Sequence, residues 1–331
     1  MGMDDSSVVS GALVWDAHGG IAPDPDLDLD VLDAWRAAGV DHVSLNVGYD
    51  VMPWHLSLAV ARAYHDRIEA LPGTRIARTV DDVTAAREAG ELAVTFDLEG
   101  AVALNGDPGL LAEYHALGVR QMLFAYNRNN DFGGGCHDVD TGLTALGREA
   151  VAEMNRLGMV VDASHCGRRT ALDLMECSAT PVIFSHSNAA AITRHGRNVS
   201  DDLIRLCAEQ GGVVGLCGIG LFLGDNEVRA STLADHACYI ADLVGPQHLA
   251  LGIDWAPPTS GIPDLTAFVL DRPDFWPEGN GYETPVRMVH PNQIAGVCSE
   301  LSARGWSRDE LEGLLSGNII RVAREAWAPR P

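Results

Sequence analysis

LTALGREAVAEMNRLGMVVDASH, residues 143–165, joins a helix pattern directly to a strand pattern. Apolar residues recur in its first part at three- and four-residue steps, which places one apolar stripe on one face of a predicted helix: Leu143, Leu146, Ala150, Met154 and Leu157. Gly158 suits the left-handed turn that ends a helix, and the apolar run Met159–His165 begins immediately after it. This stretch therefore predicts a helix that turns straight back into a buried strand.

The same cycle recurs along the chain. Glycines that separate a helical stretch from a strand stand at Gly39, Gly90, Gly118, Gly211 and Gly245. Eight apolar runs end at or beside a polar residue: Ala12–His18, His42–Gly48, Leu92–Gly100, Val119–Asn127, Met159–His165, Pro181–His186, Gly212–Gly220 and His248–Asp254. Nearly continuous apolar runs are typical of parallel strands covered on both faces. We therefore predict an α/β fold, a single eight-stranded β/α (TIM-type) barrel. A doubly wound open sheet is the alternative, but no G-x-G-x-x-G follows the first strand.

We expect one domain over residues 1–331, since β/α barrels often exceed about 250 residues as one unit. Two predicted strand-to-helix connections are long, residues 127–142 and residues 255–291. Loops of this length in a compact domain commonly form lids or binding walls, with peripheral decoration as the alternative. Cys136-His137 lies in the first of them beside three glycines, and we interpret it as loop structure rather than a metal site.

The charge and composition of the chain limit the classes of partner that it can bind. The formal net charge is −23, from 23 basic and 46 acidic residues. This charge disfavours nucleic acid and anionic membrane surfaces, because both bind basic faces. No apolar run is long enough to span a membrane, and the N-terminus lacks the pattern of a signal peptide. Seven cysteines without close pairs fit a reducing compartment, so we predict a cytoplasmic enzyme acting on a small molecule.

The strand ends carry the candidate chemistry, because the C-terminal ends of barrel strands meet at one mouth. His165 and His186 end neighbouring strands, a spacing that suits two imidazoles on one metal ion. Glu99 ends an apolar strand and needs a partner, which a cation or a nearby arginine would supply. His18 approaches as a ligand from a second direction, and Asp254 is the candidate acid/base for hydrolysis.

Together these segments resemble the membrane (renal) dipeptidase family of zinc peptidases, β/α barrels of the amidohydrolase-like group. The motifs that carry the resemblance, in order, are GLTALG (142–147), EMNRLGM (153–159), DASH (162–165), PVIFSHS (181–187) and RNVSDD (197–202). The resemblance implies a binuclear zinc centre bridged by Glu99, with His165 and His186 on one ion and His18 on the other. It further implies that Asp254 is the acid/base, that Arg197 grips the substrate carboxylate, and that the protein forms a homodimer.

Three positions depart from the family pattern. The first strand of the family ends in His-x-Asp, whereas this chain has Gly20 two residues after His18. The second zinc site therefore depends on Asp16, Asp24 or water as a substitute, or the enzyme works with one metal ion. Tyr126 replaces a histidine that polarises the scissile carbonyl, and its phenol could donate a hydrogen bond to an oxyanion. The segment Asp271–Pro277 also differs from the family, which leaves the substrate preference open.

The sequence thus predicts a zinc-dependent hydrolase that cleaves the amide bond of a dipeptide or dipeptide-like small molecule by metal-activated water. Arg197, Tyr126 and Asn127 are the predicted substrate contacts, and Asp254 and Tyr126 the predicted catalytic groups. The alternative is a divergent family member with one metal ion or none, which acts on a non-peptide small molecule or binds one without dipeptidase activity.

Overall fold

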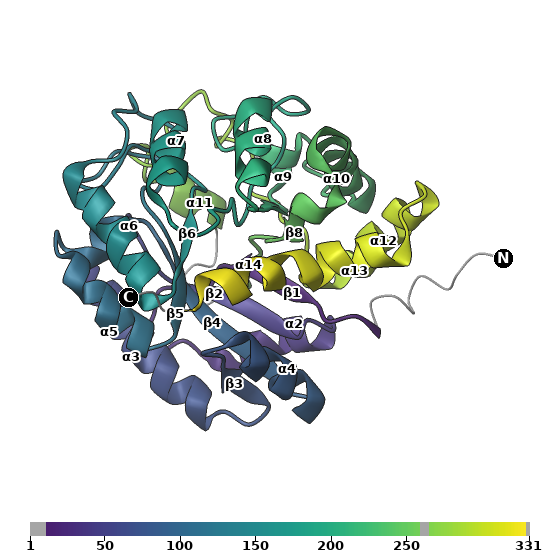
Figure 1. Ribbon diagram of the computed structural model, residues 1–331, viewed down its shortest axis with the longest axis horizontal. Coiled ribbons are helices and arrows are strands. Elements are labelled where there is room, and N and C mark those ends of the chain that lie inside the picture. The colour runs from purple at the N-terminus through teal and green to yellow at the C-terminus, as the bar shows by residue number, and fades with distance from the viewer. Residues whose placement is uncertain (1–10, 259–264, 329–331) are drawn as a thin grey trace.

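A parallel sheet that curls into a barrel forms the centre of the molecule (Figure 1). The computed structural model describes residues 11–258 and 265–328. The sheet order is β6-β5-β4-β2-β1-β8-β7, with every pairing parallel. Its strands are β1 (Trp15–Gly19), β2 (His42–Tyr49), β4 (Leu92–Glu99), β5 (Val119–Leu123), β6 (Val160–Asp162), β7 (Val214–Leu216) and β8 (Leu249–Leu251).

The eighth position of the barrel belongs to residues 181–186, which lie between β6 and β7. Ile183 forms a parallel bridge to Asp162 of β6, and Phe184 forms one to Val214 of β7. Pro181 at the start of this segment has no N–H to donate, and only these isolated bridges form, so the predicted strand is not a regular one. It nevertheless closes the ring, and the predicted barrel is confirmed.

One strand was not predicted. β3 (Thr74–Ile76) pairs with the first half of β4 at Leu92–Val94, while β5 pairs with the second half of β4 from Phe96 onward. β3 is three residues long and carries a charged residue at its centre, so it has no alternating pattern that would reveal it in the sequence.

Several strands end earlier than predicted, and the polar residue at the end of each predicted run has left the extended conformation. Asn127, His165 and Asp254 have φ angles of 61°, 62° and 57° in the left-handed region. Only a minority of non-glycine residues adopt this region, and asparagine, aspartate and histidine are the types enriched there. The chain thus turns sharply at three of the predicted site residues, beyond the ends of β5, β6 and β8.

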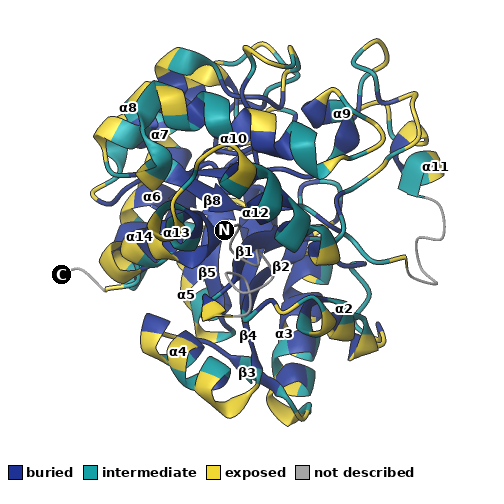
Figure 2. Cartoon of the chain, turned by 90° about the vertical axis from the view of Figure 1, so that its right-hand side faces the viewer, coloured by how far each residue is buried: buried dark blue, intermediate teal, exposed yellow. Residues whose placement is uncertain are grey.

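Helices surround the barrel, and the strands at its centre are buried (Figure 2). α6 confirms the helix predicted from residue 143 onward. It is capped by Thr144, whose side chain accepts a hydrogen bond from the Gly147 N–H, and it ends at Gly158 with φ of 83°. The helices are α2 (Asp33–Ala37), α3 (Trp54–Ala70), α4 (Val80–Ala89), α5 (Leu111–Ala116), α6 (Ala145–Leu157), α7 (Arg168–Cys177), α8 (Asp201–Glu209), α9 (Gly220–Leu223), α10 (Ala230–Val244), α11 (Leu265–Leu270), α12 (Ile294–Ala303), α13 (Arg308–Glu312) and α14 (Asn318–Ala326).

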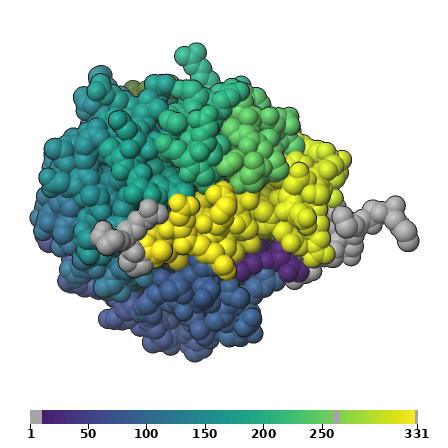
Figure 3. Space-filling view, in the orientation of Figure 1, coloured from purple at the N-terminus to yellow at the C-terminus, as the bar shows by residue number. Residues whose placement is uncertain are grey.

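The C-terminal helix closes one end of the barrel. Ile319 and Val322 of α14 pack against Trp15, Val160 and Ala250 at the beginnings of the barrel strands. On the face shown in Figure 3, the C-terminal segment lies between the N-terminal part of the chain and its middle part. The opposite end of the barrel, where the strands finish, is therefore the end at which a ligand can enter.

The described residues of the long segment 255–291, which are residues 255–258 and 265–291, pack over that open end, and residues 259–264 lie outside the described residues. Trp276 and Tyr282 form a small apolar cluster with Cys217 after β7, Phe222 of α9 and Val269 of α11. The loop is thus a wall over the mouth of the barrel rather than a peripheral decoration. Within the part of the chain that the structure describes, no helix is both long and apolar enough to cross a lipid bilayer.

Candidate metal centre

Three imidazoles converge on one oxygen of Glu99. The Nε2 atoms of His165, His186 and His18 lie 3.2, 3.3 and 3.4 Å from Glu99 Oε1. His165 Nε2 and His186 Nε2 are 2.9 Å apart, and the His18 ring stacks on the His186 ring with centroids 4.0 Å apart. All four side chains are buried. The barrel therefore brings together the four residues predicted to hold metal, although they are far apart in the sequence.

The tautomer of His165 follows from Asn127. The Asn127 Nδ2 donates to the Phe275 carbonyl oxygen at 3.1 Å, which turns its Oδ1 toward His165 Nδ1 at 2.8 Å. Because an amide oxygen can only accept, His165 Nδ1 carries the proton. His165 Nε2 then presents a lone pair toward Glu99. Asn127 was predicted to contact substrate, yet the structure commits both ends of its amide to these two partners.

The other two imidazoles are oriented in the same way. The Ser185 hydroxyl donates to Asp162, so its oxygen is left to accept from His186 Nδ1 at 2.7 Å. His18 Nδ1 lies 3.2 Å from Asp97 Oδ2, which can only accept. In each case Nδ1 donates its proton to a neighbouring oxygen, and Nε2 is the ring nitrogen that faces Glu99. The sequence analysis did not identify Asp97, Ser185 or Asp162 in these roles.

The atoms that converge on this point carry negative partial charge, so a cation would be stabilised among them. Three nitrogen lone pairs and a carboxylate oxygen repel one another unless a positive charge lies among them, and His18 Nε2 is buried without a hydrogen-bond partner. Burial raises the pKa of Glu99 to about 8. Burial lowers the pKa of His18, but Asp97, Glu99 and Asp254 outweigh it and hold that pKa well above its usual value. The centre thus holds one positive charge, a proton or a metal ion. Imidazole nitrogens with one carboxylate suit Zn²⁺ and similar divalent ions.

The substitutes considered for a second metal site are engaged elsewhere. Asp16 accepts from the Trp35 indole N–H at 3.1 Å and from the Ile253 N–H at 3.0 Å. Asp24, which is only half-buried, accepts from the N–H of Asp26 in its own loop. Neither carboxylate is therefore available to join His18.

Gly20 contributes a close packing contact instead of a ligand. Its N–H donates to the Trp255 carbonyl oxygen at 3.0 Å, and a Cβ built on it would lie 3.1 Å from the Ala256 Cβ. The first strand thus offers the centre one side chain, His18. The next carboxylate is that of Asp254, whose Oδ1 lies 3.6 Å from His18 Nε2.

Asp254 stands where a proton-transfer group would be needed. Its Oδ2 faces the Cys217 thiol at 3.6 Å, which leaves Oδ1 directed toward His18. Burial raises the pKa of Asp254, although the charge of His18 opposes this rise. The side chain also lines the cavity at the barrel mouth. A carboxylate that is both beside the candidate metal centre and open to the cavity can accept a proton there and release it to a bound molecule.

Tyr126 covers the centre from the cavity side. Its ring stacks on His165 with centroids 4.2 Å apart, and it lines the cavity. Its backbone N–H donates to Asp50 Oδ2 at 2.9 Å, and Asp50 Oδ1 accepts from the Val102 N–H at the same distance. Gly100 is required beside this carboxylate, because its φ is 122° and a Cβ would collide with Asp50. Asp50, which the sequence analysis missed, thereby ties together the ends of two strands.

Arg197 is buried without a carboxylate. It is 2% exposed, its Nη2 donates to the His186 carbonyl oxygen at 3.0 Å, and its Nε has no partner. No ion pair to Arg197 forms among the described residues. The guanidinium lies 5.3 Å from the centroid of the Phe222 ring, and Phe222 lines the cavity whereas Arg197 does not. An unpaired buried cation is costly, which makes this side chain a candidate to meet an anionic group of a ligand.

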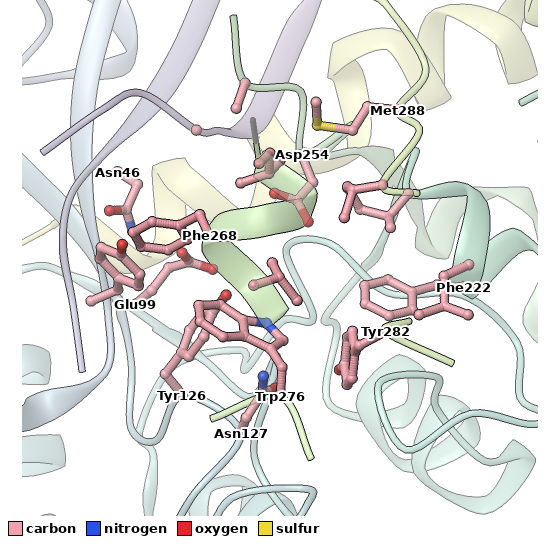
Figure 4. A pocket seen from close by; sticks show the side chains of 18 of the residues that line it. Asn46, Glu99, Tyr126, Asn127, Phe222, Asp254, Phe268, Trp276, Tyr282 and Met288 are labelled. Carbon is pink, nitrogen blue, oxygen red and sulfur yellow. The ribbon is translucent and has the colours of Figure 1, made fainter. Parts of the chain in front are cut away.

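The cavity at the mouth has a volume of about 260 Å³. In Figure 4, Asn46 and Glu99 lie on one side of it and Phe222 and Tyr282 on the opposite side, with Asp254 between them. Its lining includes Gly20, Asn46, Tyr49, Glu99, Tyr126, Asn127, His165, Leu221, Phe222, Asp254, Leu265, Phe268, Val269, Trp276, Tyr282, Val286 and Met288. The candidate metal centre therefore opens into a cavity of a size that suits a small molecule.

One known protein family matches most of this chain. Residues 49–278 match the membrane dipeptidase family, peptidase family M19. The chain belongs to this family. The family named from the motifs is thus confirmed, and His18 and Gly20 lie before the matched residues.

Individual relatives agree with this assignment. An uncharacterized dipeptidase of Schizosaccharomyces pombe is 31% identical over 267 residues, which cover 76% of this chain and 61% of that protein. Dipeptidase tcpJ of Claviceps purpurea is 30% identical over 271 residues, 80% of this chain and 57% of that protein. This chain thus spans less than two thirds of the length of these curated relatives.

Solved structures share the fold. An amidohydrolase from Pseudomonas aeruginosa superimposes with a TM-score of 0.88 at 23% identity, covering 98% of this chain and 99% of that chain. A metallo peptidase from Rhodobacter sphaeroides, solved with a phosphinate mimic of the dipeptide L-Ala-D-Ala, has a TM-score of 0.76 at 22% identity and covers 96% and 99%.

Proposed function

We propose that this protein is a metal-dependent hydrolase that cleaves the amide bond of a dipeptide or a dipeptide-like small molecule. The observation that carries the proposal is the convergence of the Nε2 atoms of His165, His186 and His18 on one oxygen of Glu99, beside the cavity at the barrel mouth. Membership of the membrane dipeptidase family supports the same reaction.

Glu99, His165 and His186 would hold one ion, which we propose to be Zn²⁺, with His18 beside them. A bound zinc ion would lower the pKa of a water molecule from about 16 to about 7 and polarise the amide carbonyl. A second ion has weaker support, because Gly20 supplies no carboxylate and Asp16 is bonded elsewhere. We therefore propose one tightly bound ion per chain.

The remaining residues would bind substrate and move the proton. Asp254 would accept a proton at Oδ1 and deliver it to the departing amine, while the Cys217 thiol steadies Oδ2. The Tyr126 hydroxyl would donate a hydrogen bond to the developing oxyanion. Arg197, whose buried Nε has no partner, would pair with the substrate carboxylate. Asn127 would act by holding His165 in its metal-binding tautomer.

The test is removal and return of the metal. Chelation of the purified protein should abolish hydrolysis of a panel of L-dipeptides, and zinc should restore it, with elemental analysis reporting the ions bound. Glu99→Gln should abolish both zinc binding and hydrolysis, whereas Glu88→Gln, an exposed position on α4, should change neither. Turnover that persists after complete chelation would contradict the proposal.

Gly20 and Tyr126 favour a second candidate, a family member that acts on a non-peptide small molecule at the same centre. A protein that binds zinc but leaves every dipeptide of the panel intact would favour this candidate.

Two further expectations remain proposals. The odd number of seven cysteines, without close pairs in the sequence, supports a reducing, cytoplasmic location. The homodimer implied by the family is tested by light scattering of the purified protein.

A further inference from the structure

The cavity beside the candidate metal centre has an aromatic wall. Phe222 of α9, Phe268 of α11 and Trp276 and Tyr282 of the loop 255–291 all line it. Aliphatic side chains and a methionine line the same cavity: Leu221, Leu265, Val269, Val286 and Met288. Figure 4 shows Phe222, Tyr282 and Trp276 bordering the space into which the carboxylates of Glu99 and Asp254 point. A molecule held at the centre must therefore place part of itself against an apolar surface.

A charged side chain of a substrate would find no ionic partner on this wall. None of the described residues that line the cavity is a lysine or an arginine. The acidic groups of the lining, Glu99 and Asp254, are both at the centre itself. The Tyr282 hydroxyl is also occupied, since it lies 2.7 Å from His137 Nε2. A charged substrate side chain would lose its water here without gaining an ionic partner.

The wall is already formed without a ligand. The His137–Tyr282 hydrogen bond joins the loop 127–142 to the loop 255–291. Phe268 and Trp276 meet edge to face with centroids 5.9 Å apart, and the guanidinium of Arg272 lies 3.8 Å from the Phe268 ring centroid. Preformed walls discriminate by shape, because a substrate that fits them does not have to order them.

We propose that the physiological substrate carries a large apolar side chain, aromatic or branched aliphatic, which packs against Phe222, Phe268 and Trp276. This inference rests on the proposed hydrolase function and deepens it by naming the substrate class. In an apolar pocket, each additional methylene that fits is typically worth about 10-fold or more in kcat/KM. A substrate with only methyl side chains leaves most of this wall in contact with water.

The experiment compares kcat/KM of the zinc-loaded protein for Ala-Ala, Ala-Asp, Ala-Lys, Ala-Phe, Phe-Ala and Leu-Phe. We expect the best substrate that carries a phenyl or isobutyl group to exceed Ala-Ala by at least about 10-fold. We expect the two charged dipeptides to fall below Ala-Ala.

Wall variants separate packing from general damage. Trp276→Ala and Phe268→Ala should each lower kcat/KM for the preferred apolar dipeptide by about 10-fold more than they lower that for Ala-Ala. Leu270→Ala is the matched control, because it lies on α11 beside the wall but is 49% exposed and does not line the cavity. It should change neither value. Two independent wall positions keep the test valid if one variant fails to fold.

The outcomes are distinguishable. If no dipeptide is hydrolysed, the proposed function fails. If Ala-Ala or a charged dipeptide is hydrolysed as well as the apolar ones, or if the wall variants lower all rates equally, the proposed substrate class is wrong while the hydrolase function stands.

Discussion

Replacing Asn127 by glycine is expected to weaken zinc binding although no proposed metal ligand is changed. Asn127 accepts the Nδ1 proton of His165 at 2.8 Å and so keeps the Nε2 lone pair toward the ion. Losing the partner of a buried donor costs about 1–3 kcal/mol. At 1.4 kcal/mol per factor of ten, this corresponds to about 5- to 150-fold in affinity. Outer hydrogen-bond partners of metal-binding histidines typically contribute about 10- to 100-fold. Competition for zinc with a chromophoric chelator measures the effect without requiring catalysis.

A matched control exists elsewhere in the chain. Asn105 also has a positive φ, 49°, at the end of a 3₁₀ turn, and it is exposed and remote from the centre. Glycine tolerates this backbone conformation at both positions, so Asn105→Gly reproduces the backbone change alone. Zinc affinity of Asn127→Gly within about 3-fold of Asn105→Gly would show that the proton on His165 is not held by Asn127, contrary to the magnitude expected for such a partner.

Three other predictions concern the acid/base, the first strand and the pH dependence of stability. Asp254→Asn should lower kcat by about 10²- to 10⁴-fold while zinc affinity changes little, as kinetics and chelator competition would show. Gly20→Asp, combined with Ala256→Gly to relieve the 3.1 Å contact, should raise the zinc content measured by elemental analysis from about one ion per chain toward two. Burial lowers the pKa of His42 to about 3, so the unfolded chain binds a proton below about pH 6.5 that the folded protein does not. Between pH 7 and pH 5 the wild type should therefore lose about 2 kcal/mol of unfolding free energy that His42→Gln does not lose, measured by urea denaturation; equal losses would contradict this role of His42.

The sequence predicted the architecture because the helix–glycine–strand cycle is strong, and it misplaced those boundaries where the backbone is unusual. The run Met159–His165 looks like one strand, yet β6 ends at Asp162, and His165 turns into the left-handed region three residues later. Pro181 begins a segment that takes its place in the barrel through only two bridges. β3 is too short to show a pattern.

The predicted metal ligands converge because each follows or ends a barrel strand, a property that sequence order conveys. Their hydrogen-bond partners were harder to find. Asp97 could have been found, since it precedes Glu99 by two residues and so shares its face of β4. Ser185 and Asp162 meet only when residues 181–186 close the barrel against β6, which no local pattern reveals. The contact of the Arg197 guanidinium with the Phe222 ring likewise depends on how a loop folds.

The left-handed backbone at Asn127, His165 and Asp254 restricts how this centre can change. Cysteine would serve chemically as a zinc ligand at position 165, but residues with a Cβ and no compensating local hydrogen bond adopt this conformation at a cost of roughly 1–2 kcal/mol, and β-branched residues hardly at all. Exchanging the donor atoms at these sites would require rebuilding the turns that carry them. Attempts to retune the metal preference, by selection or by design, therefore have more freedom at Glu99, which lies within a regular strand, than at His165.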